Sequence, residues 1–243
     1  TTGEGDPVVM VKGLGGTSTF FDAVSTRLAS GNQVTAFDLE GHGRSPLSGD
    51  LSIPGWAEDL GAVLDHLGAS SASIVSHSMG TVIAQEFAAH NPDRVKKLVL
   101  LGPIRELPDG GRDGLRDRAT TVRENSMGAV AAGIANGGTG PRTKEARPEI
   151  VGYARESLLR QDDEGYAAAC EALAASEDAD QEAISCPVLL VTGTDDGLAP
   201  PEKAERLTAG FTNGHLEVID GIGHWTVIEA SIEVAALVAD FLA

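Results

Sequence analysis

Short apolar runs recur along the whole chain, and they lack the apolar–polar alternation of a strand that has one face in water. Each run is four to six residues long, and most are rich in Val, Leu and Ile. Such runs predict strands that are buried on both faces of a parallel sheet. The predicted strands are Pro7–Val11, Gln33–Phe37, Ser73–Ser76, Leu98–Leu101, Pro187–Thr192 and Leu216–Ile219.

Helical patterns lie between these runs. The predicted helices are Phe20–Ala29, Ile53–Leu67, Met79–His90, Pro201–Ala209 and Val227–Leu242. A regular alternation of strand and helix predicts an α/β fold, with a mostly parallel sheet flanked by helices.

The alternation stops between Pro103 and Ser185. This stretch carries helical patterns at about Leu115–Ala135, Glu149–Arg160 and Glu164–Ala175, with a glycine-rich break at Asn136–Pro141. We interpret it as an inserted helical lid, so that residues 1–102 and 186–243 form the core and residues 103–185 the lid. A peripheral decoration is the alternative, but the insertion lies between the candidate nucleophile and the candidate acid described below.

The charge of the chain is strongly negative, with 18 Lys and Arg against 36 Asp and Glu, for a net charge of −18. Such a surface repels phosphates, so neither nucleic acid nor a membrane is an expected partner. Two cysteines do not form a disulfide framework, which favours a reducing, cytoplasmic location. The chain begins at Thr1 without Met, which allows for the removal of a leader or a first strand. Nothing in the pattern indicates an oligomeric state.

The strand Ser73–Ser76 leads into Ser76–Gly80, which reads Ser-His-Ser-Met-Gly and continues as a helical pattern. This small-x-Ser-x-Gly pattern is typical of a nucleophile elbow. A serine in so sharp a turn has a strained backbone, at a cost of about 1–3 kcal/mol. Ser78 is therefore the candidate nucleophile, and its hydroxyl is expected to face solvent above the sheet. The plainer alternative is that Ser78 only caps the helix that begins at Met79.

A serine hydroxyl needs a base to take its proton. His224 is the best placed histidine, because it follows the last predicted strand in the glycine-rich loop Asp220–Trp225. The base needs a buried carboxylate that fixes its tautomer, and Asp195 and Asp196 are equal candidates on their chemistry alone. The other histidines are expected to be structural or solvated, with His77 pointing away from Ser78; they are His42, His66, His77, His90 and His215.

With these residues, the chain resembles the lidded α/β-hydrolase family over almost its whole length. The order Ser, Asp, His along the chain is that of the family. Four further segments carry the resemblance: Val11–Gly16 is similar to the family's His-Gly-x-x-Gly oxyanion loop, Phe37–Ser45 to its Asp-x-Arg-Gly-His-Gly-x-Ser turn, Gly193–Pro200 to its acid loop, and Gly221–His224 to its histidine loop.

The resemblance implies that Asp196 is the acid and that the backbone N–H groups of Leu14 and Met79 hold the oxyanion. The mechanism requires no cofactor and no metal. Two residues depart from the family pattern, since Lys12 replaces the usual histidine and Glu40 the usual arginine. Family members also usually have two strands before the oxyanion loop, whereas only one is predicted here.

Within the family, the segments Glu156–Ala172 and Ile184–Val188 are most similar to 3-oxoadipate enol-lactonase-like hydrolases. This implies a serine hydrolase that cleaves a lactone or a small carboxylic ester, with 3-oxoadipate enol-lactone as one candidate. A C–C bond hydrolase or a haloperoxidase-like member of the same fold is an alternative. A small-molecule receptor that keeps the triad is an alternative of another class.

An anionic lactone would need a local cation in the pocket, because an unpaired carboxylate in a partly dry site costs several kcal/mol. An arginine fork suits a carboxylate better than Lys12 does. One or two lid arginines at most are expected to line the pocket, and the candidates are Arg118, Arg123, Arg142, Arg155 and Arg160.

Overall fold

The computed structural model describes residues 1–243. Six strands form one sheet in the order β2-β1-β3-β4-β5-β6, and every neighbouring pair is parallel. The strands are β1 (Asp6–Val11), β2 (Asn32–Phe37), β3 (Ala72–His77), β4 (Val95–Leu101), β5 (Val188–Gly193) and β6 (Gly214–Ile219). All six predicted strands are therefore confirmed, and the sheet is that of an α/β fold.

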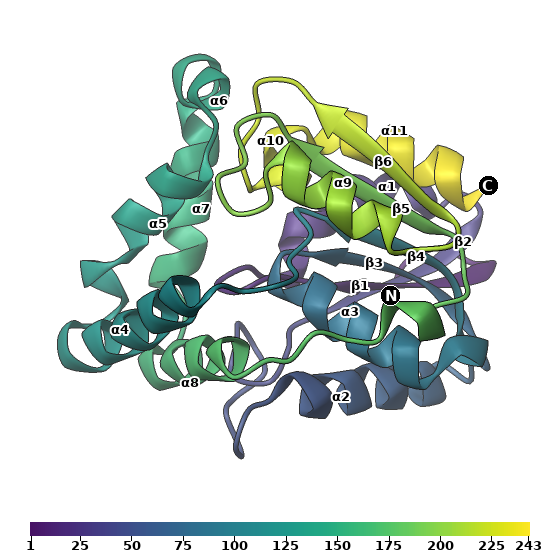
Figure 1. Ribbon diagram of the computed structural model, residues 1–243, viewed down its shortest axis with the longest axis horizontal. Coiled ribbons are helices and arrows are strands. Elements are labelled where there is room, and N and C mark those ends of the chain that lie inside the picture. Colours follow the sequence, from purple (N-terminus) through teal and green to yellow (C-terminus); the bar gives the residue numbers. More distant parts are fainter.

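Helices cover both faces of the sheet (Figure 1). One face carries α1 (Asp22–Leu28) packed on α11 (Ser231–Leu242), and the other carries α2 (Ile53–His66), α3 (Met79–His90) and α9 (Pro201–Ala209). The short helix α10 (Thr226–Glu229) precedes α11. None of the helices combines the length and the apolar character that a membrane crossing needs.

Five helices are inserted between β4 and β5 and gather beside one edge of the sheet (Figure 1). They are α4 (Asp109–Asn125), α5 (Ala131–Gly138), α6 (Pro141–Ala146), α7 (Pro148–Leu159) and α8 (Asp163–Ala174). These inserted helices share the core of the sheet, because one cluster of 62 buried side chains includes strand residues such as Val99 and inserted residues such as Leu158.

The predicted single helix over Leu115–Ala135 is wrong. The helix α4 ends before Ser126, where φ is 62° and the side chain accepts a hydrogen bond from the N–H of Gly128. Serine competes with the helix in this way by bonding to nearby backbone. The helix α6 was not predicted at all, since the glycine-rich break is shorter than expected and Pro141 begins a new helix.

The carboxyl ends of the strands point toward the inserted helices (Figure 1). In a parallel sheet these ends lie along one edge, so the loops that follow β1, β3, β5 and β6 come together there. The inserted helices reach this edge through a close backbone contact. A Cβ on Gly165 in α8 would collide with the carbonyl oxygen of Gly41.

We expect Gly165→Ala to lower the free energy of unfolding by about 1–3 kcal/mol, because the added methyl pushes α8 away from the core. Gly152→Ala in α7 is the matched control. Its Cβ would meet nothing within 4 Å, so it is expected to raise stability by about 0.5–1 kcal/mol through helix propensity. Urea unfolding of both variants checks the prediction, and equal effects of the two substitutions would contradict it.

Candidate active site

Ser78 lies at the sharp turn between β3 and α3, with φ 53° and ψ −123°. The turn brings α3 so close to β1 that a Cβ on Gly80 would collide with the carbonyl oxygen of Val11. Ser76 fits in the usual glycine position because its hydroxyl donates to the carbonyl of Val99 at 2.9 Å. One expectation is wrong: Ser78 is only 8% exposed, and its hydroxyl faces an imidazole rather than open solvent.

The structure brings Ser78, His224 and Asp196 together in one hydrogen-bonded chain. The His224 Nδ1 lies 2.9 Å from Oδ2 and 3.1 Å from Oδ1 of Asp196. Because a carboxylate only accepts, Nδ1 carries the hydrogen and Nε2 is left as an acceptor. Nε2 lies 2.8 Å from the Ser78 Oγ, so the imidazole is placed to take the serine proton.

Asp196 is 1% exposed and its carboxylate binds the imidazole, whereas Asp195 is exposed. The backbone N–H groups of Leu198 and Ala199 donate to the Asp196 Oδ1 at 2.9 and 2.8 Å. Burial by itself raises the pKa of Asp196, but the charge and hydrogen bond of His224 and these two N–H groups together lower it to about 2. Asp196 is therefore a carboxylate at neutral pH.

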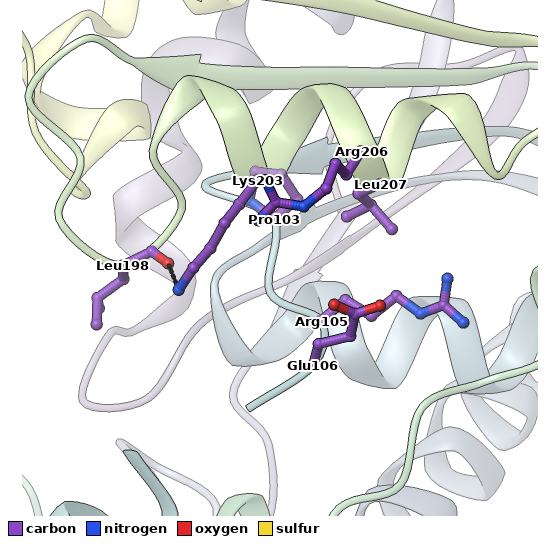
Figure 2. A pocket seen from close by; sticks show the side chains of 7 residues that line it. All are labelled: Pro103, Arg105, Glu106, Leu198, Lys203, Arg206 and Leu207. Carbon is purple, nitrogen blue, oxygen red and sulfur yellow. Dashed lines mark hydrogen bonds between the residues drawn. The ribbon is translucent and has the colours of Figure 1, made fainter. Parts of the chain in front are cut away.

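Figure 2 shows one side of the loop between β5 and α9, where the Lys203 ammonium donates to the carbonyl of Leu198 at 3.4 Å. A small cavity on this side contains no member of the Ser78–His224–Asp196 chain. It bears three cationic side chains and one carboxylate, and its lining consists of Pro103, Arg105, Glu106, Leu198, Lys203, Arg206 and Leu207. The Lys203 ammonium of α9 thus contacts the loop that carries Asp196.

The loop after β1 lies against Ser78. A Cβ on Gly13 would be 2.7 Å from the Cβ of Ser78, and the N–H of Gly16 closes a turn onto the Gly13 carbonyl at 3.1 Å. Leu14 lies inside this turn. Met79 is the first residue of α3, so its N–H is one of those that a helix leaves without an internal partner. Both predicted oxyanion residues therefore neighbour Ser78.

Lys12, which stands in place of the family's histidine, is fully buried, and its ammonium has no hydrogen-bond partner. Burial lowers the pKa of Lys12 well below its usual range, and the Asp38 carboxylate opposes that shift. His42 is also buried rather than solvated. Its Nδ1 donates to the Glu40 carbonyl at 3.2 Å, and its Nε2 has no partner. Glu40 itself accepts from Ser48 at the surface.

Two side chains that hold the histidine loop were missed from the sequence. His77 does not simply point away: its Nε2 donates to the backbone carbonyl of His224 at 2.8 Å, and burial lowers the pKa of His77 to about 3. Glu229 accepts from the N–H groups of Gly223 and Trp225, both at 3.1 Å. The only sequence signal for Glu229 was an acidic residue within an apolar helical run.

No group of three or more His, Cys, Asp or Glu side chains is arranged to hold a metal ion. The site consists instead of a serine, an imidazole, a carboxylate and nearby backbone N–H groups. This arrangement can deliver an activated hydroxyl to an electrophilic carbon and stabilise the negative charge that develops there.

The chain matches the alpha/beta hydrolase fold family over residues 6–231. It belongs to that family. The match covers both segments of the core and the inserted helices, and it agrees with the six-stranded parallel sheet.

The names of two curated relatives specify different substrates. The chain is 31% identical over 189 residues to 3-oxoadipate enol-lactonase 2 of Acinetobacter baylyi, which covers 77% of this chain and 70% of the relative. It is 28% identical to 2-hydroxymuconate semialdehyde hydrolase of Pseudomonas putida over 99% of this chain and 88% of the relative.

Two solved structures share the fold. A thermophilic esterase from Thermogutta terrifontis, with malate bound, superposes with a TM-score of 0.94 at 28% identity, covering 99% of this chain and 90% of the esterase. The enol-lactonase from Burkholderia xenovorans LB400 gives a TM-score of 0.88 at 24% identity, covering 99% and 92%.

We expect Asp196→Asn to lower kcat by about 10⁴-fold, because an amide tends to hold the wrong imidazole tautomer and does not stabilise the imidazolium. Asp195→Asn is the matched control and should keep kcat within a few-fold of wild type. Steady-state hydrolysis of an activated ester checks this. The reverse order of damage would mean that Asp195 is the acid.

Lys12→Met should change how stability depends on pH. The folded chain releases the Lys12 proton well below pH 10.4, whereas the unfolded chain keeps it until about pH 10.4. Between these two values the unfolded chain holds the extra proton, so the wild type gains stability as pH rises. We expect the free energy of unfolding of wild type, relative to Lys12→Met, to rise by up to about 1.4 kcal/mol per pH unit toward pH 10. A difference that stays constant from pH 7.5 to 10 would contradict this account of Lys12.

Proposed function

We propose that the protein is a carboxylic ester hydrolase that cleaves a lactone or small ester through an acyl-enzyme on Ser78. The observation that carries the proposal is the continuous hydrogen-bonded chain from Ser78 Oγ through His224 to a buried Asp196. Membership of the α/β-hydrolase family and the strained turn at Ser78 support it.

In the proposed reaction, Ser78 Oγ attacks the ester carbonyl carbon while His224 Nε2 takes its proton. The N–H groups of Leu14 and Met79 stabilise the oxyanion of the tetrahedral intermediate. As the intermediate collapses, the leaving alkoxide takes the proton from His224 and departs as an alcohol. Water, deprotonated by His224, then attacks the acyl-enzyme, and Ser78 leaves with the proton restored.

The inserted helices are proposed to act as a lid. Ser78 is 8% and His224 4% exposed, so the surrounding chain covers most of both residues. A lid also limits the wetting of the site. For a lactone this matters, because the leaving alcohol stays tethered to the acyl group and water must compete with ring closure. Free, buried Cys170 and Cys186 support a reducing location such as the cytoplasm.

A panel of lactones, short-chain esters and vinylogous C–C substrates, followed by pH-stat and absorbance, tests the proposal. We expect sustained turnover of a lactone or ester. Preferred turnover of a C–C substrate would favour the alternative of a C–C bond hydrolase of the same fold. A single covalent event without further turnover would support the receptor alternative.

Among the lid arginines, Arg118 is the best candidate to bind a substrate carboxylate. It is half-buried, and its guanidinium lies near the hydroxyl of Tyr166, which is buried without a hydrogen-bond partner. The Tyr166 ring in turn lies against Gly15 of the oxyanion loop. The other arginines are engaged or exposed: Arg123 pairs with Glu164 and Glu171, Arg142 donates to the Asp220 carbonyl, Arg160 pairs with Glu156, and Arg155 is exposed.

We expect Arg118→Met to raise KM for a carboxylated lactone about 10-fold or more while KM for a neutral ester of similar size stays within about twofold, because only the anion loses a charge-assisted partner. Arg160→Met is the control and should affect neither substrate. Steady-state kinetics with the two substrates measures the selectivity. Equal effects on both substrates, or a clear preference of the wild type for neutral lactones, would show that the substrate is neutral rather than anionic.

A further inference from the structure

Glu229 is a buried carboxylate that binds only backbone N–H groups. It lies at the end of α10, between apolar neighbours, and is 5% exposed. Its Oε2 accepts from Gly140 at 2.8 Å, both of its oxygens accept from Gly223 at 3.1 Å, and its Oε1 accepts from Trp225 at 3.1 Å. No cation pairs with the carboxylate, since Arg147 donates to the backbone carbonyl of Glu229 instead. Three backbone N–H donors thus converge on one carboxylate through charge-assisted hydrogen bonds.

Two of the three donors flank His224 in the sequence. The peptide groups of His224 itself are fixed as well, because its N–H donates to the Gly138 carbonyl at 2.7 Å and its carbonyl accepts from His77 at 2.8 Å. The N–H groups of residues 223–225 and the carbonyl of His224 are therefore all hydrogen-bonded. A displacement of this loop would move Nε2 directly away from Ser78, and about 1 Å of misplacement can cost on the order of 100-fold in rate.

The third donor comes from the lid. Gly138 ends α5 and Gly140 immediately precedes α6. Their backbone packs directly on the histidine loop: a Cβ on Gly140 would be 2.7 Å from the N of Gly223, and a Cβ on Gly223 would be 2.5 Å from the carbonyl oxygen of Gly138. One carboxylate therefore joins an inserted segment to a core loop that is more than 80 residues away in the sequence. This part of the lid cannot leave the core without breaking a bond to Glu229.

We propose that Glu229 is a positioning residue: it holds the histidine loop in register with Ser78 and fastens the Gly138–Gly140 segment of the lid to that loop. The inference rests on the proposed role of His224 as the base. Any movement of the lid consequently leaves the Gly138–Gly140 segment in place against the histidine loop.

Glu229→Gln tests the positioning role, because the amide replaces one acceptor oxygen by an NH₂ group. That group cannot accept a hydrogen bond from the backbone N–H donors. We expect kcat to fall about 10- to 100-fold with KM changed less than threefold, and the rate of fluorophosphonate labelling at Ser78 to fall in parallel. Glu229→Asp, which keeps a carboxylate, should recover part of the loss. Glu233→Gln, an exposed glutamate on α11, is the matched control and should match wild type.

Labelling is measured per folded molecule, so that a mere loss of stability does not count. A folded Glu229→Gln with wild-type kcat and labelling rate would overturn the positioning role. Wild-type turnover and labelling at Ser78 are measured first, and their absence would refute the proposed function rather than this inference.

Hydrogen exchange in the wild type tests the fastening to the lid without any variant. The amides of Gly140, Gly223 and Trp225 share one acceptor, so we expect them to exchange with the same opening free energy. A Gly140 amide that exchanges at least 100-fold faster than the other two would show that the lid segment detaches on its own, and would overturn the fastening.

Discussion

The backbone of Ser78 holds a conformation, φ 53° and ψ −123°, that residues with a side chain rarely adopt. Such a conformation persists only where the surroundings over-determine it. Here the strand β3 is buried along its whole length, α3 packs so closely on β1 that only glycine fits at position 80, and the Ser78 N–H is bound to the Leu101 carbonyl at 2.9 Å. The central strands of the sheet hold this strained turn, and the turn directs the Ser78 hydroxyl toward the imidazole.

Asp196 and His224 meet Ser78 at that turn, but hydrogen bonds outside the turn hold them in place. Asp196 is fixed by two N–H groups of its own loop, and His224 by His77, Gly138 and the bonds of Glu229 to its neighbours. The parallel sheet brings these loops to one edge, but it does not set their distances to within a few tenths of an ångström. That precision comes from buried hydrogen bonds to backbone, which are costly to leave unmade.

Local pattern was enough to predict the six strands, the turn at Ser78 and the choice of His224, because each is encoded within about ten neighbouring residues. The choice between Asp195 and Asp196 was not local, since it depends on which carboxylate turns inward toward a histidine that follows a different strand. The break at Ser126 was missed because one side-chain hydrogen bond to Gly128 outweighs a favourable helical pattern. His77 and Glu229 were missed for the same kind of reason: their partners His224 and Gly140 lie 147 and 89 positions away.

The central claim is that Ser78 carries the acyl group during turnover, and intact-protein mass spectrometry tests it most directly. After rapid mixing with an activated acetate ester and acid quenching, we expect a mass increase of one acetyl group that maps to the peptide containing Ser78. Ser78→Ala should show no adduct and should lose about 10³- to 10⁶-fold in kcat while remaining folded. An adduct on another residue, with turnover surviving in Ser78→Ala, would contradict the account.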